Sequence, residues 1–109
     1  MEGTIRRIAE LNDAMRKSMK GGRVFLTAGI VAHGAEFQAD VLEKVKGFSE
    51  FGPDNDPHGE HDFGRVEVDG QELFWKFDYY DPTLTLHSDD AADPGRTVRV
   101  LTIMLAEEY

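Results

Sequence analysis

The side chains best suited to chemistry lie close together in one segment, residues 54–62, of this 109-residue chain. The segment holds four carboxylates and two imidazoles: Asp54, Asp56, His58, Glu60, His61 and Asp62. Imidazole and carboxylate groups of this kind bind zinc or manganese. A metal-dependent hydrolase that uses His58, Glu60, His61 and Asp62 is therefore one possible function. The alternative is a turn-rich loop whose Asp and Asn side chains accept backbone N–H bonds, with His61 bridging a strand to a helix.

Other catalytic chemistry finds no support in the residue types and their spacing. The chain has no cysteine, which excludes thiol catalysis, a disulfide scaffold and Cys-ligated zinc. Its serines, Ser18, Ser49 and Ser88, do not stand in a nucleophile-elbow motif. No glycine-rich segment has the spacing of a phosphate-binding loop. We therefore expect a binding protein with no catalytic residues, no metal site and no cofactor.

The charge of the chain is concentrated in its second half. The formal net charge is −9, from 12 basic and 21 acidic residues. Residues 1–49 carry a net charge of +2, whereas residues 50–109 carry −11. A surface of that kind repels nucleic acid and acidic membranes and attracts basic protein surfaces. The alternative is that the acidity serves solubility alone.

The density of these acids suggests imitation of nucleic acid. Duplex DNA carries about one negative charge per 1.7 Å of its axis. Thirteen acids lie between Glu50 and Asp93, so they approach that density if the fold gathers them on one flank. Aromatic side chains among them would anchor a partner. The residues expected to contact the partner are Asp54, Asp56, Glu60, Asp62, Glu67, Asp69, Phe74, Asp78, Tyr80, Asp81, Asp89, Asp90 and Asp93.

Hydrophobic periodicity and turn residues predict the elements that must position these side chains. In chain order they are a helix over 4–19, a strand over 23–27, a helix over 34–47, strands over 63–68 and 72–80, and a helix over about 94–108. In the last of these, Val98, Leu101 and Leu105 form an apolar stripe at helical spacing. The two strands on either side of Asp69 and Gly70 are typical of a β-hairpin.

The hairpin gives the clearest local prediction. Alternate residues from Leu73 to Tyr79 are apolar and are expected in the core. Their neighbours from Phe74 to Tyr80 form a half-exposed face suited to binding. A two-residue turn would place Gly64 opposite Trp75, which gives the indole room, and Glu67 opposite Glu72, which is unfavourable. A longer loop would relieve that pair, so two registers remain open.

Taken together, the elements predict one α+β domain over residues 1–109. The expected order is α-β-α-β-β-α, with a three-stranded, mainly antiparallel sheet in which the hairpin 63–80 is packed by helices. No apolar stretch approaches the roughly 20 residues of a membrane span, and the first residues lack a signal-peptide core. We expect a cytoplasmic protein that is a monomer or a weak homodimer.

Three runs of residues carry a resemblance to a known family. They are DNDPHGEHDFG at 54–64, FWKFDYYD at 74–81 and RVLTIMLAEEY at 99–109. Over about Ile5 to Tyr109 the chain resembles a family of small bacterial proteins classed as a domain of unknown function, number three-seven-six-eight. The resemblance implies no catalytic residues. Because genes of this kind are often found on mobile genetic elements, it favours a role in counter-defence or plasmid maintenance.

The function expected from these observations is that of a small acidic inhibitor that imitates nucleic acid. Its partner would be a basic nucleic-acid-binding protein or complex of bacterial defence, such as a CRISPR effector or a restriction enzyme, with no direct contact to nucleic acid or membrane. The alternatives are the metal-dependent hydrolase and an adaptor or antitoxin-like protein that uses the Phe74/Tyr80 face.

Overall fold

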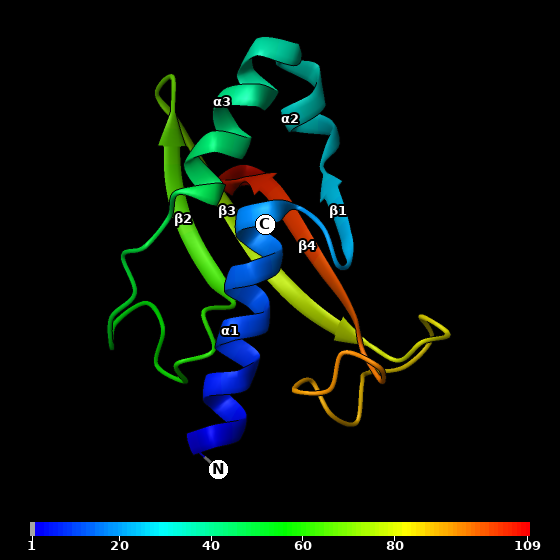
Figure 1. The fold of residues 1–109 in the computed structure, drawn as a ribbon. Coiled ribbons are helices and arrows are strands. Elements are labelled where there is room, and N and C mark those ends of the chain that lie inside the picture. The colour runs from blue at the N-terminus through cyan, green and yellow to red at the C-terminus, as the bar shows by residue number, and fades with distance from the viewer. Residues whose placement is uncertain (1) are drawn as a thin grey trace.

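The chain forms a four-stranded mixed sheet with helices against one face (Figure 1). The computed structural model describes residues 2–109, with side chains from residue 3 onward. The elements are α1 (Glu2–Ser18), β1 (Arg23–Leu26), α2 (Ala28–Ala32), α3 (Ala35–Lys46), β2 (Phe63–Val68), β3 (Gln71–Tyr80), β4 (Val98–Leu105) and the 3-10 helix η1 (Ala106–Glu108). The strand order is β1-β4-β3-β2, with β1 parallel to β4 and the other pairs antiparallel.

The expected C-terminal helix over 94–108 is wrong, because these residues form β4 and η1. Strand β4 lies between β1 and β3 and is buried on both faces. The sequence of a strand in that position is a continuous run of apolar residues, and periodicity alone does not distinguish such a run from a buried helix. Its β-branched residues Val98, Val100, Thr102 and Ile103 are typical of a strand. The expected order and the three-stranded antiparallel sheet are wrong for the same reason.

The short helix α2 was also absent from the expected order. It has five residues, too few to show a helical period, and it buries Ile30 in the core. The helices over 4–19 and 34–47 and the strand over 23–27 are confirmed as α1, α3 and β1, within a few residues at each end.

The hairpin is confirmed in its two-residue register, with Asp69 and Gly70 in the turn. Gly64 lies opposite Trp75, and Glu67 lies opposite Glu72. The repulsion between these two carboxylates is reduced, because the Arg65 Nε donates to the Glu72 carboxylate at 2.6 Å. Leu73, Trp75 and Phe77 are buried in the core as expected, and Tyr79, the fourth residue of that face, is partly buried against it.

Helix α1 is held on the sheet by polar side chains as well as apolar ones. Asn12 and Arg16 are fully buried. Arg16 donates to the carbonyls of Val45 and Lys46 at the end of α3, at 2.9 and 3.2 Å. A cation at the C-terminus of a helix satisfies carbonyls that have no partner within the helix. This contact fixes α1 against α3 and therefore fixes where the residues of α1 meet the loops.

The described part of the chain contains no helix long and apolar enough to cross a membrane.

Candidate functional site

Two acidic loops leave the sheet at the same end. Because the pairs β2–β3 and β3–β4 are antiparallel, β2 and β4 begin where β3 ends, and Tyr80 lies opposite Val98. The segments 47–62 and 81–97 therefore both join that end, while the hairpin turn lies at the other. In Figure 1 they lie on either side of the N-terminal half of α1. We call the segments 54–62 and 81–93 together the acidic end.

The structure brings most, but not all, of the predicted partner-binding residues together. The acidic end contains Asp54, Asp56, Glu60, Asp62, Asp81, Asp89, Asp90 and Asp93. Asp78 and Tyr80 lie on the face of the sheet that the helices leave uncovered, and Phe74 lies there too, packed against Phe63 and Tyr109. Glu67 and Asp69 lie at or beside the hairpin turn, at the opposite end of the sheet.

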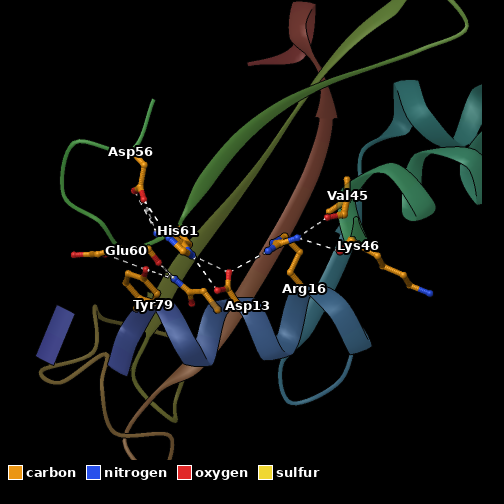
Figure 2. A network of polar contacts seen from close by, with 9 residues as sticks. Asp13, Arg16, Val45, Lys46, Asp56, Glu60, His61 and Tyr79 are labelled. Atoms are coloured by element: carbon orange, nitrogen blue, oxygen red, sulfur yellow. Dashed lines mark hydrogen bonds and ion pairs between the residues drawn. The ribbon is translucent and has the colours of Figure 1, made fainter. Parts of the chain in front are cut away.

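His61 holds the first loop against α1 (Figure 2). Its Nδ1 lies 3.0 Å from both carboxylate oxygens of Asp13, and its Nε2 lies 3.7 Å from the Asp56 Oδ2. The imidazole stacks on Phe51 with 3.8 Å between ring centroids. The backbone N–H of His61 donates to the Asp56 carboxylate. Asp56 is 8% exposed, so it organises the loop and is not available to a partner.

A buried network joins the two loops through α1. The Asn12 amide donates to the Tyr79 hydroxyl at 2.8 Å and to the Glu60 carbonyl at 3.0 Å. The Tyr79 hydroxyl in turn donates to the Glu60 carboxylate at 3.1 Å. Arg99 donates to the side-chain oxygen Oδ1 of Asn12 and to the backbone carbonyl of Ala91 in the second loop. Burial raises the pKa of the Tyr79 hydroxyl, which stays protonated as a donor.

Negative charge is crowded around Asp62. Burial raises the pKa of the Asp62 carboxyl above its usual range, and the nearby carboxylates of Glu60 and Asp56 raise it further. A carboxylate whose neighbours disfavour its charge marks a concentrated negative field. The ionised Asp62 side chain therefore lowers the free energy of unfolding relative to a neutral side chain at the same position.

Asp62→Asn is expected to increase the free energy of unfolding at neutral pH. Because the folded pKa is raised, the native state binds the proton more tightly than the unfolded chain, and stability falls as pH rises from the ordinary value of 3.8 through the folded pKa. The gain from the substitution is thus present at pH 7 and shrinks toward zero as the pH falls below the folded pKa. Denaturant unfolding of both proteins across this range measures it.

The matched control is Asp54→Asn, which removes the same charge from an exposed position in the same loop. Its effect on stability is expected to stay within about 0.5 kcal/mol of zero, as for other exposed sites. A gain for Asp54→Asn as large as that for Asp62→Asn would show that general charge repulsion, and not the site around Asp62, is responsible.

The second loop keeps its carboxylates in fixed positions. Asp81 accepts the Thr83 hydroxyl at 2.7 Å and the backbone N–H of Thr85 at 3.1 Å, and these bonds lower the pKa of the Asp81 carboxyl. Asp90 and Asp93 each accept a backbone N–H two residues further on. Such turns order the loop and leave the charges in place. The side chain of Asp89 is 87% exposed and lies 3.5 Å from Arg96.

The metal-site alternative gains no support from the geometry. In residues 2–109, no group of three or more His, Cys, Asp or Glu side chains is placed to hold a metal ion. Both ring nitrogens of His61 already face carboxylates of the protein.

A cavity of about 690 Å³ lies on the uncovered face of the sheet. Asp78 and Tyr80 line it, as do Arg23 and Phe25 of β1, which the sequence analysis did not single out. The alternation of exposed and half-buried residues in β1 places Arg23 and Phe25 on the same face. Because β1 has only four residues, this alternation is a weak signal in the sequence.

Comparison with known proteins identifies a family and no individual relative. The family model described as "Protein of unknown function (DUF3768)" matches residues 26–108. No curated protein and no solved structure matches the chain.

Proposed function

The chain belongs to the DUF3768 family of proteins of unknown function, and we propose that it acts as a small acidic binding protein. Its acidic end occupies the nucleic-acid-binding site of a basic partner protein. The partner is a component of a bacterial defence complex, of the CRISPR effector or restriction type, which the chain inhibits by imitating nucleic acid.

The observation that supports this proposal most directly is that two acidic loops, far apart in the sequence, join the same end of the sheet. The raised pKa of Asp62 is a second sign that carboxylates are crowded there. Ion pairs offset this charge only in part: in residues 3–109, the carboxylate of the acidic end that lies within 4 Å of an arginine or lysine side chain is Asp89, beside Arg96. A field of this sign steers a basic surface toward the acidic end and raises the rate of association.

The number of charges is of the right order for this role. Seven carboxylates of the acidic end have exposed or half-exposed side chains. One strand of a DNA duplex presents about nine phosphates over 32 Å, and 32 Å is the intermediate dimension of the molecule. The acidic end therefore approaches the charge of one strand, and it suits a groove that grips a backbone more than one that reads bases.

The test compares two triple variants that change the net charge equally. Asp54→Asn, Asp62→Asn and Asp89→Asn remove three charges from the acidic end, where Asp54 and Asp89 are exposed and Asp62 is half-buried. Glu36→Gln, Glu67→Gln and Asp69→Asn remove three from the opposite end, where Glu36 and Asp69 line one shared hollow. Asp56 is left intact because it is buried.

The acidic-end variant is expected to bind its partner about tenfold more weakly and with a flatter dependence on salt, whereas the control variant binds as the parent protein does. Partners are captured from a bacterial lysate and identified, and their affinity is then measured with purified protein at about 50 and 200 mM salt. Duplex DNA should displace the chain from the partner. Equal loss in both variants, or no displacement by DNA, would reject the proposal.

A further inference from the structure

The cavity on the uncovered face of the sheet has the size of a small-molecule site. Its volume of about 690 Å³ lies within the range of roughly 300–1,000 Å³ found for such sites. Phe25 of β1, Tyr80 of β3 and Tyr109 beyond β4 contribute aromatic rings to it. Phe25 is 51% exposed and Tyr109 is 74% exposed. Large apolar side chains exposed around one hollow indicate a surface that a ligand covers.

Three of the four charged side chains that line the cavity already have partners. The Lys76 Nζ lies 3.1 Å from the Asp78 carboxylate. The Glu108 carboxylate accepts the Thr27 hydroxyl and the backbone N–H of Gly29, which lowers its pKa. Arg23 is exposed and, in the part of the chain that the structure describes, makes no ion pair. Its guanidinium is therefore the charge in this cavity that is left to bind a ligand.

The second acidic loop forms one wall of the cavity. Leu84 lines the cavity with its backbone in the left-handed region, at φ 62°. Its N–H donates to the Asp81 carbonyl at 2.9 Å, and His87 pairs with Tyr80 as an isolated bridge to the end of β3. A bulky residue keeps this conformation only where the surrounding structure imposes it. The wall is therefore present before any ligand binds.

We propose that this cavity binds a small planar aromatic molecule that carries one anionic group, a carboxylate or a phosphate. The aromatic ring packs against Phe25, which lies two residues from Arg23 on the same face of β1, since aromatic pairs prefer offset or edge-to-face contact. The anionic group pairs with Arg23, whose planar fork of donors matches a carboxylate or phosphate. The net charge of −9 repels a polyanion strongly and a single charge weakly. A compact molecule with a single anionic group thus reaches Arg23 where a nucleic acid does not.

The test uses four probes and protein-observed NMR titration of the isotope-labelled full chain. Phenyl phosphate and benzoate carry both features of the ligand, benzyl alcohol lacks the charge, and inorganic phosphate lacks the ring. Phenyl phosphate or benzoate is expected to bind about tenfold more tightly than the other two, and which of them binds better distinguishes a phosphate from a carboxylate ligand. Backbone shifts are expected at Arg23, Phe25 and Tyr80.

Arg23→Gln is expected to weaken binding of the anionic probes about tenfold and to leave benzyl alcohol unaffected. Lys17→Gln is the matched control, because Lys17 is an exposed cation on α1 and does not line the cavity. Equal binding of charged and uncharged probes, an unchanged affinity in Arg23→Gln, or shifts confined to the other face would overturn the proposal. The acidic-end variant should retain this binding, so the two proposals can fail separately.

Discussion

Gly64→Ala is expected to lower the free energy of unfolding by about 3 kcal/mol, at the upper end of what overpacking a core costs. A Cβ atom on Gly64 would overlap the indole of Trp75 at its Nε1 and Cε2 atoms. Trp75 has no exposed surface and contacts Phe48, Phe51 and Phe77 edge to face. The indole is therefore held by rings on its other sides and cannot move away from the added methyl group.

Denaturant unfolding followed by the fluorescence of Trp75, the single tryptophan, measures this loss. Gly3→Ala is the matched control, because a Cβ at Gly3 meets no atom within 4 Å and the residue lies in α1. Alanine is favoured over glycine in a helix, so Gly3→Ala should be neutral or slightly stabilising. A loss below about 0.5 kcal/mol for Gly64→Ala would mean that the indole is not tightly confined.

Arg16→Ala is expected to cost about 3–5 kcal/mol, the usual cost of removing one member of a buried polar network. The guanidinium lies 5.2 Å from the ring centroid of Trp75 and 5.5 Å from that of Phe51. It also donates to the carboxylate of Asp13 at 3.0 Å and to the last carbonyls of α3. Without it, those carbonyls lose their partner, Asp13 keeps only its contact with His61, and a cavity opens between α1 and the sheet.

The matched control for Arg16→Ala is Lys17→Ala, because Lys17 is the next residue of α1 and is exposed. We expect a change within about 0.5 kcal/mol for the control. Arg16→Lys is expected to recover little of the loss, since one ammonium group cannot reproduce a guanidinium whose Nη1 reaches the two carbonyls of α3 while its Nη2 reaches Asp13. If Arg16→Lys were as stable as the parent protein, a simple charge at this position would suffice and the fork geometry would not matter.

The same contacts link stability to the acidic end. Asp13 accepts from Arg16 on one side and faces His61 on the other. A change at Arg16 therefore acts on the position of the first acidic loop as well as on the helix. Hydrogen exchange in residues 54–62 of Arg16→Ala would show whether the loop opens before the molecule unfolds.

Local sequence was sufficient for the hairpin and for the two longer helices. Asp69 and Gly70 favour one turn type, and alternation along β3 decides which side chains face the core. Helical spacing of Phe37, Val41 and Val45 does the same for α3. Each of these signals arises between residues close in the chain, so no distant partner is needed to interpret it.

The identity of β4 depended on distant partners. A run of eight mostly apolar residues fits a buried helix or a central strand equally well. Its pairing with β1, more than 70 residues earlier, and with β3 decides between them. The antiparallel hairpin already places residues 62 and 81 at the same end of the sheet, and the pairing of β4 with β3 fixes the far end of the second acidic loop there as well. A terminal helix would have left the two loops at the same end but would not have fixed where the second loop ends.

The acidity of the loops is therefore evident from the residues themselves, and the hairpin already places residues 62 and 81 together, whereas the position at which the second loop ends depends on the pairing of β4. The burial of Asp56 and the exposure of Arg23 and Phe25 were likewise decided by tertiary contacts. The type of a side chain determines which chemical interactions it can make, and that type is the same in any fold. Which groups become neighbours depends on contacts between segments that are distant in the sequence. The free energy of those contacts cannot be obtained from a local sequence pattern.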